Sequence, residues 1–200
     1  MKRVLLLGDS IRMGYDSYVK EILEGEGGFE VVFDDVDNGR FAAYTLWQAN
    51  QFFRNQGQFD IVHWNNGYWD MNIEKPMTEA IHPVDEYIHF LGRILKEIRR
   101  NGAVPIFATT TPILPRDIAL DIKNEKMPFS DYVNDWVLKY NAAAVSFMEG
   151  EGVAVNDLYT VCLEDKYFYK GPDLLHLTEK GYRRLAEKTA EAIRDAAMHI

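Results

Sequence analysis

Short apolar runs alternate along this chain with longer amphipathic stretches, and this alternation is the feature that most restricts its fold. Near-continuous apolar runs of this length are typical of parallel strands that are covered on both faces. One amphipathic stretch is followed by Asn101-Gly102, a common signal at the end of a helix. The pattern predicts strands at residues 4–7, 31–33, 61–64, 104–108 and 153–155, and helices at 15–24, 44–54, 84–100, 132–149 and from 178 to about 198.

This order of elements predicts an α/β fold with one parallel sheet. Strands that alternate with helices are joined by right-handed crossovers, which place helices on both faces of a doubly wound sheet. The 200 residues suit a single domain covering 1–200, because a chain of this size can bury one large core. The sequence contains no internal repeat, low-complexity tract or interdomain linker.

Two connections are unusually long, at residues 65–83 and 109–130. Each follows a predicted strand, so both should lie at the carboxyl edge of the sheet, where ligands bind in folds of this kind. Long loops in compact domains are usually functional. We therefore expect a binding or catalytic site at this edge.

The charge of the chain argues against several classes of function. A net charge of -9 disfavours nucleic acid and anionic membrane surfaces as partners. No window approaches the length of a membrane span, and the apolar run at residues 4–7 is too short for a signal peptide, so we expect a cytoplasmic protein. The one cysteine, Cys162, excludes an intramolecular disulfide and a thiolate metal cluster, and its apolar surroundings predict a buried structural thiol.

A serine stands where the first predicted strand gives way to the first helix, in Gly8-Asp9-Ser10. At such a corner the hydroxyl of Ser10 lies at the carboxyl edge of the sheet, and its backbone N–H lies near the positive end of the helix. This geometry suits a nucleophile whose attack creates an oxyanion. The alternative is that Asp9 or Ser10 only caps the helix, which both residue types often do.

Asp173 and His176 precede the last predicted helix at a spacing of three residues. Both side chains can project from one turn, so the carboxylate can accept a hydrogen bond from one imidazole nitrogen and leave the other free to act as a base. The remaining histidines lack comparable surroundings. We interpret His63 as a core residue of a strand and the other three, His82, His89 and His199, as structural or neutral.

Gly8-Asp9-Ser10-Ile11 and Asp173-x-x-His176, taken together in this order, resemble the SGNH/GDSL hydrolase superfamily over nearly the whole chain. The resemblance implies a flavodoxin-like, three-layer α/β/α fold with a five-stranded parallel sheet. It also implies hydrolysis of small esters without a metal or other cofactor. Ser10 would be the nucleophile, His176 the general base and Asp173 the residue that orients it.

Two further blocks of that family supply donors for the oxyanion, and here the chain departs from the pattern. In the second block, Asn38 and Thr45 match, but Ala43 stands where a glycine donates its backbone N–H. In the third block, Trp69 occupies the position of an asparagine donor. We predict that Asn66, or alternatively Asn65, donates in its place, beside the N–H groups of Ser10 and Ala43. The alternative is that both amides only hold the loop.

We therefore expect a carboxylic ester hydrolase that acts on small acyl groups, with acetyl esters of carbohydrates as the favoured substrates. Tyr68, Trp69 and Arg40 are candidates to contact such a substrate. An acyltransferase with the same triad and a non-catalytic sugar-binding module on the same fold are the alternatives. The first strand–helix turn lacks a glycine-rich fingerprint, which disfavours a dinucleotide. The oligomeric state is left open.

Overall fold

The computed structural model describes residues 1–114, 134–170 and 174–200. Five parallel strands form one sheet in the order β2-β1-β3-β4-β5, which confirms the predicted α/β class and the flavodoxin-like arrangement. The strands are β1 (Lys2–Leu7), β2 (Phe29–Val32), β3 (Ile61–Asn65), β4 (Val104–Ala108) and β5 (Ala154–Asn156).

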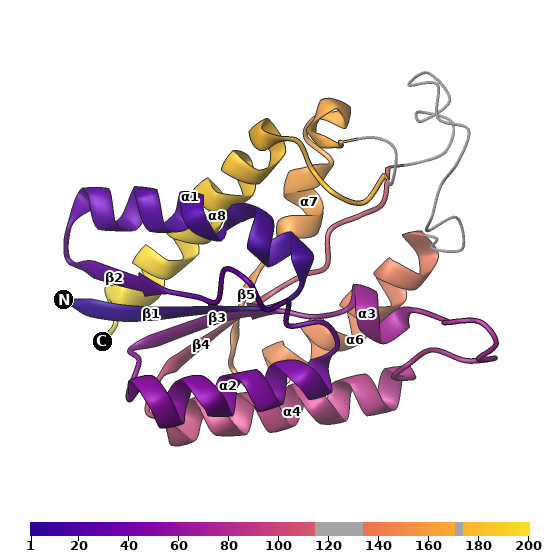
Figure 1. The fold of residues 1–200 in the computed structure, drawn as a ribbon, viewed down its shortest axis with the longest axis horizontal. Coiled ribbons are helices and arrows are strands. Elements are labelled where there is room, and N and C mark those ends of the chain that lie inside the picture. Colours follow the sequence, from indigo (N-terminus) through magenta and orange to yellow (C-terminus); the bar gives the residue numbers. More distant parts are fainter. Residues whose placement is uncertain (115–133, 171–173) are drawn as a thin grey trace.

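Helices cover both faces of this sheet (Figure 1). One face carries α1 (Ser10–Glu26), α7 (Leu158–Cys162) and α8 (Glu179–Ala197). The other face carries α2 (Ala42–Gln56), α4 (Val84–Arg100) and α6 (Asn134–Gly150). Right-handed crossovers require this distribution, because the chain moves from β1 in one direction to β2 and then in the opposite direction to β3, β4 and β5. Two shorter helices, α3 (Tyr68–Met71) and the 3₁₀ turn η1 (Lys166–Phe168), lie in connections.

Several element boundaries differ from the predicted ones, each for a local reason. Helix α1 begins at Ser10 rather than at residue 15, because the Asp9 side chain accepts from Ile11 N–H and caps the helix. The second strand is Phe29–Val32 instead of 31–33 and pairs in register with the start of β1. The short helices α3, α7 and η1 were not predicted, because three to five residues are too few to show a helical period.

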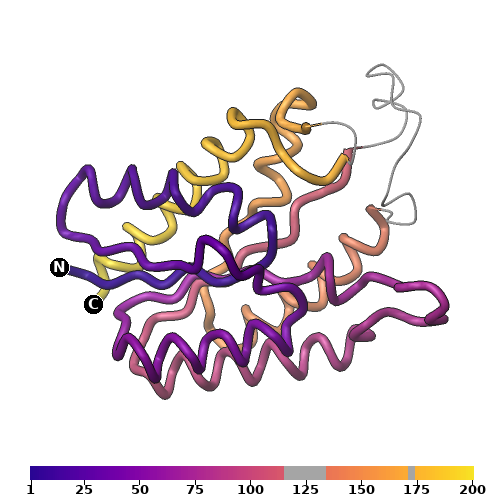
Figure 2. The backbone as a smooth tube through the Cα atoms, viewed as in Figure 1, coloured from indigo at the N-terminus to yellow at the C-terminus, as the bar shows by residue number. Residues whose placement is uncertain are grey.

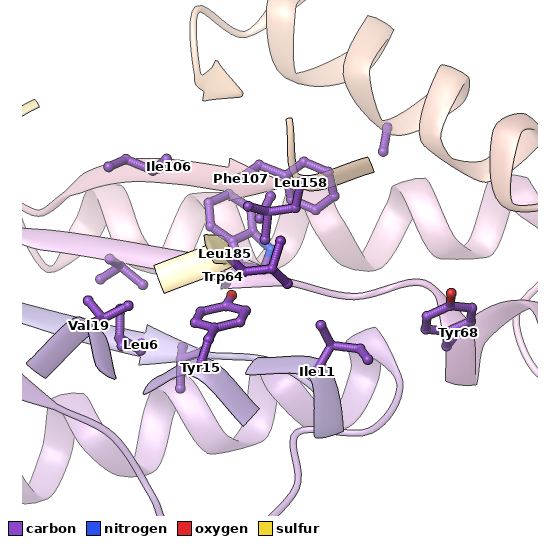
Figure 3. Packing of buried hydrophobic residues seen from close by; sticks show 14 of the residues in the cluster. Leu6, Ile11, Tyr15, Val19, Trp64, Tyr68, Ile106, Phe107, Leu158 and Leu185 are labelled. Carbon is purple, nitrogen blue, oxygen red and sulfur yellow. The ribbon is translucent and has the colours of Figure 1, made fainter. Parts of the chain in front are cut away.

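The core lies between the sheet and its two helical layers. Trp64 on β3 is fully buried and meets Phe107 on β4 edge to face, with ring centroids 5.4 Å apart. Figure 3 shows Tyr15 and Val19 of α1 packed beside Leu6 on the same side of the sheet. Cys162 is buried, as predicted. Burial of large side chains on both faces explains why the strands read as almost unbroken apolar runs.

The order of the strands places a topological switch point at the carboxyl ends of β1 and β3. The chain crosses β1 when it passes from β2 to β3, so its connections leave the neighbouring strands β1 and β3 toward opposite faces at this point. Such a switch point is where ligands bind in open α/β sheets. Leu7 pairs with Trp64 at this end, so residues 8–10 and 65–66 emerge side by side. Both chain termini lie toward the opposite end of the sheet (Figure 2).

Two negative findings concern only the described part of the chain. None of its helices is long and apolar enough to cross a membrane. It also contains no group of three or more His, Cys, Asp or Glu side chains arranged to hold a metal ion.

Candidate active site

The turn after β1 places Ser10 at the switch point of the sheet. Gly8 has a φ of 142°, and a Cβ added there would lie 2.1 Å from Asn65 Oδ1 and 2.8 Å from Asn65 O. Only glycine allows this close approach of the two strand ends. Asp9 then caps α1 by accepting from Ile11 N–H at 3.0 Å, and Ser10 follows as the first residue of the helix, half-buried. The sequence left open whether Asp9 or Ser10 caps the helix. Asp9 supplies the cap, so the Ser10 side chain is not needed for it.

His176 reaches Ser10 from the segment that precedes α8. Lys170 N–H donates to His176 O at 2.8 Å, and Thr178 N–H donates to Phe168 O at 2.6 Å, so the segment is anchored at the histidine and two residues after it. Leu174 is buried in the left-handed region with a φ of 58°, and its carbonyl accepts from Leu114 N–H at 2.9 Å. Backbone hydrogen bonds thus fix the path of this segment.

Ser10 and His176 meet across 166 residues of sequence. Ser10 Oγ lies 2.9 Å from His176 Nε2, within hydrogen-bond reach. In the neutral imidazole that carries its hydrogen on Nδ1, Nε2 accepts the hydroxyl proton and can act as a general base. Asp173, the predicted partner on the Nδ1 side, lies outside the described residues.

Asn65 supports the turn that carries the nucleophile. Its Nδ2 donates to Asp9 Oδ1 at 2.9 Å, and both side chains are almost completely buried. Burial raises the pKa of Asp9, while the hydrogen bonds from Asn65 and Ile11 act in the opposite direction. The Asn65 amide therefore holds the Asp9 carboxylate at the end of β3, independently of any donation to an oxyanion.

Asn66 is bound to the loop before α2. Its Nδ2 donates to Thr45 Oγ1 at 2.8 Å and to Arg40 O at 3.1 Å. A side-chain amide nitrogen carries two hydrogens, so both are engaged. Donation to an oxyanion from Asn66 would require one of these bonds to break, and the alternative interpretation, that the amide holds the loop, accounts for its contacts.

Ala43 is the second residue of α2, where a helix leaves backbone N–H groups without internal partners. It has ordinary helical backbone, so alanine is tolerated without strain where the resemblance expects glycine. Gly39 N–H donates to Gly8 O at 2.8 Å, which joins the loop before α2 to the nucleophile turn. A Cβ at Gly39 would lie 2.4 Å from Gly8 O, so this contact requires glycine.

The three candidate substrate contacts differ in their exposure. Tyr68 is buried on α3, and its hydroxyl donates to Thr111 O. Trp69, the next residue, is partly exposed. The Arg40 guanidinium lies 4.5 Å from the centre of the Tyr44 ring, with 42% of its side chain exposed. The burial of Tyr68 gives it the environment of a packing residue, whereas Trp69 and Arg40 remain accessible.

Sequence reasoning missed one buried pair beside the site. Asp70 Oδ1 lies 2.7 Å from His82 Nδ1 and also accepts from Ala42 N–H at 2.9 Å. His82 was interpreted from the sequence as structural or neutral, without a partner. No local pattern links positions 70 and 82, because the segment between them contains no periodic element. The available signal was that Asp70 is the last residue of the third block, Gly67-Tyr68-Trp69-Asp70.

Comparison with known proteins identifies the family and agrees with the fold. The profile of the GDSL-like lipase/acylhydrolase family matches residues 60–189. No curated protein sequence matches the chain. A GDSL-like lipase from Bacteroides thetaiotaomicron superposes with a TM-score of 0.72 at 16% identity, over 98% of this chain and 89% of that one.

Two further solved structures share the fold. An acetyl xylan esterase, AlAXEase, has a TM-score of 0.71 at 17% identity, over 96% of this chain and 99% of that one. The psychrotrophic esterase EstA from a Pseudoalteromonas species, in a structure inhibited by monoethylphosphonate, has a TM-score of 0.68 at 12% identity, over 98% of each chain. With the family profile spanning most of the sheet and the segment of His176, the chain belongs to the GDSL-like lipase/acylhydrolase family.

Proposed function

We propose that the protein is a serine-dependent carboxylic ester hydrolase for small acyl groups. The observation that carries this proposal is the 2.9 Å contact between Ser10 Oγ and His176 Nε2 at the switch point of the sheet. Ser10 attacks the carbonyl carbon of the ester, and its proton passes to His176 Nε2. The tetrahedral intermediate then collapses, and His176 returns that proton to the alcohol as it leaves.

The second half of the reaction repeats these steps with water. His176 takes a proton from water, the hydroxide attacks the acyl-serine, and Ser10 regains its proton as the carboxylic acid departs. In this proposal Asp173 accepts from His176 Nδ1 and favours the imidazolium. The N–H groups of Ser10 and Ala43, each in the first turn of a helix, donate to the oxyanion.

Acetyl esters of carbohydrates are the substrates that we propose first. A hydrolase of the same fold is an acetyl xylan esterase, and Trp69 and Arg40 are accessible near the loops that border the site. The assay therefore compares p-nitrophenyl esters of graded acyl length with an acetylated sugar. We expect the highest kcat/KM for acetyl.

The test of the nucleophile uses Ser10→Ala, with Ser17→Ala as a matched control because Ser17 is exposed on the same helix. We expect Ser10→Ala to lower kcat by roughly four orders of magnitude or more, and Ser17→Ala to leave it unchanged. A phosphonate ester inhibitor should add once per chain, at Ser10 by peptide mass spectrometry. Labelling of another serine, or turnover in Ser10→Ala, contradicts the proposal.

A further inference from the structure

The start of helix α2 is capped by a residue that lies far away in sequence. Phe41 precedes the helix and offers no side-chain acceptor. The N–H of Ala42, the first residue of the helix, instead donates to Asp70 Oδ1 at 2.9 Å across 28 residues. Asp70 is completely buried, and a carboxylate at this end of a helix is favoured by the helix dipole. Asp70 therefore supplies from α3 the cap that the local sequence lacks.

His82 completes this arrangement. Its Nδ1 lies 2.7 Å from the same Asp70 oxygen. When Asp70 is ionised its carboxylate only accepts, and Nδ1 then carries the hydrogen. The backbone holds the residue from both sides, since His82 N–H donates to Asp70 O at 2.9 Å and Tyr140 hydroxyl donates to His82 O at 2.8 Å. The imidazole also meets the Phe41 ring edge-on at 5.4 Å and the Phe90 ring at 4.8 Å. The ring is thus immobilised against the residue that precedes α2.

The Asp70 carboxylate depends on these two donors. Burial raises the pKa of Asp70, while the hydrogen bonds from His82 and from Ala42 favour the ionised form. Its other oxygen, Oδ2, is buried without a hydrogen-bond partner among the described residues. Loss of the His82 donor would therefore weaken the charge and the position of the oxygen that holds the first turn of α2.

We propose that Asp70 and His82 are positioning residues of the oxyanion hole. They hold the first turn of α2, in which Ala43 N–H follows directly after the Ala42 N–H that Asp70 binds. This inference rests on the proposed function, because it assigns Ala43 N–H to the developing oxyanion. A donor displaced by a fraction of an ångström stabilises the transition state less and leaves binding of the neutral ester nearly unchanged. The effect should therefore fall on kcat and not on KM.

The test compares two substitutions of His82. Asparagine can place an amide N–H where Nδ1 stands, because both nitrogens are bonded to Cγ, whereas leucine has no donor there. We expect His82→Leu to lower kcat roughly ten- to a hundred-fold with KM within about twofold, and His82→Asn to restore kcat to within about threefold of wild type. His89→Leu is the matched control, because His89 is exposed on α4 and should change neither constant.

A second measurement keeps this inference separate from the proposed function. The Ala42 amide proton, bound to a carboxylate, should resonate downfield in the NMR spectrum, move upfield in His82→Leu and stay in place in His82→Asn. A wild type that turns over no ester contradicts the proposed function, and the amide shift then decides the positioning role by itself. The inference is overturned if the Ala42 amide is unchanged in His82→Leu. It is also overturned, in an active enzyme, if His82→Asn loses as much kcat as His82→Leu.

Discussion

Buried polar side chains on β3, the strand next to β1, each have a specific hydrogen-bond partner. Asn65 donates to the Asp9 carboxylate, which in turn caps the helix that begins with Ser10. His63, on the same strand as Asn65, is fully buried, and its Nε2 lies 3.0 Å from Asn156 Nδ2. Because desolvation makes unpaired polar groups costly, the loss of one such partner should be measurable.

Removal of the Asn65 amide should destabilise the protein. In Asn65→Ala the buried Asp9 carboxylate loses a donor, so we expect the free energy of unfolding to fall by about 1–3 kcal/mol, together with a lower kcat. Denaturant unfolding measures the first effect. Asn50→Ala is the control, because Asn50 is exposed on α2 and should stay within about 0.5 kcal/mol of wild type. Equal stabilities of the two variants would contradict the task assigned to Asn65.

His63 should make stability depend on pH. Burial lowers the pKa of His63 to about 3, so the imidazole stays neutral in the folded state between about pH 3 and its usual range. In the unfolded chain His63 binds a proton with a pKa of ~6.5. Stability therefore falls as the pH drops below that value. In His63→Gln this contribution is absent, while an amide oxygen can still accept from Asn156.

The two unfolding curves should therefore diverge on acidification. We expect the pH slope of the free energy of unfolding to be steeper in wild type by up to about 1.4 kcal/mol per pH unit between pH 6 and 4. Chemical denaturation at a series of pH values measures both slopes. Parallel slopes for wild type and His63→Gln would show that His63 is protonated in the folded state.

At the scale of elements, the site depends on contacts between the ends of strands and the loops that follow them. The loop before α2 is joined to the nucleophile turn by the bond from Gly39 N–H to Gly8 O. The buried Arg12 of α1 holds the segment just before that loop, with donation to Asp34 O at 2.6 Å and to Asp37 O at 3.2 Å. Helices α1 and α2 are thus connected by backbone contacts at their N-terminal ends, where both proposed oxyanion donors lie.

A methyl group at Gly39 should disturb this junction. The added Cβ would lie 2.4 Å from Gly8 O and 2.8 Å from Gly8 C, both backbone atoms, so the loop must move. We expect Gly39→Ala to lose about 1–3 kcal/mol of stability and roughly tenfold or more in kcat. Gly25→Ala, at a helical position with nothing within 4 Å, should gain about 0.5–1 kcal/mol. Thermal unfolding and steady-state kinetics distinguish the two; an active, stable Gly39→Ala would refute the close contact.

At the scale of the whole molecule, two properties bear on the proposed active site. The sheet order brings its segments together, and the net charge sets the potential around it. The order β2-β1-β3-β4-β5 brings the Gly8–Ser10 turn next to the end of β3, although more than fifty residues separate them. The chain as a whole carries a net charge of -9, from which we expect a negative long-range potential at the site.

This potential should appear as a salt dependence that varies with the charge of the substrate. An ester with a carboxylate on its leaving group is repelled at low ionic strength, and added salt screens that repulsion. Between 10 and 300 mM NaCl we expect kcat/KM for 4-carboxyphenyl acetate to rise by roughly twofold or more, while kcat/KM for phenyl acetate stays constant. Identical salt responses for the two esters would mean that local cations cancel the net charge at the site.

The sequence by itself determined the class of fold and the two ends of the proposed catalytic contact. Apolar runs and helical spacing located all five strands, because burial on both faces demands such runs wherever the sheet forms. Ser10 could be identified because a strand–helix corner is a local feature. His176 could be identified because Asp173 stands three residues before it.

Tertiary structure decided which polar side chains already have hydrogen-bond partners. The sequence placed Asn65 and Asn66 at the right edge, but their hydrogen-bond partners lie 21 to 56 residues away, so no local pattern could show that both amides are already engaged. The cap that Asp70 provides for α2 and its contact with His82 were not predicted either, because these partners are 28 and 12 residues apart in sequence. A hydrogen bond depends on distances of a few ångströms between atoms, and packing sets those distances between segments that the sequence pattern describes only one at a time.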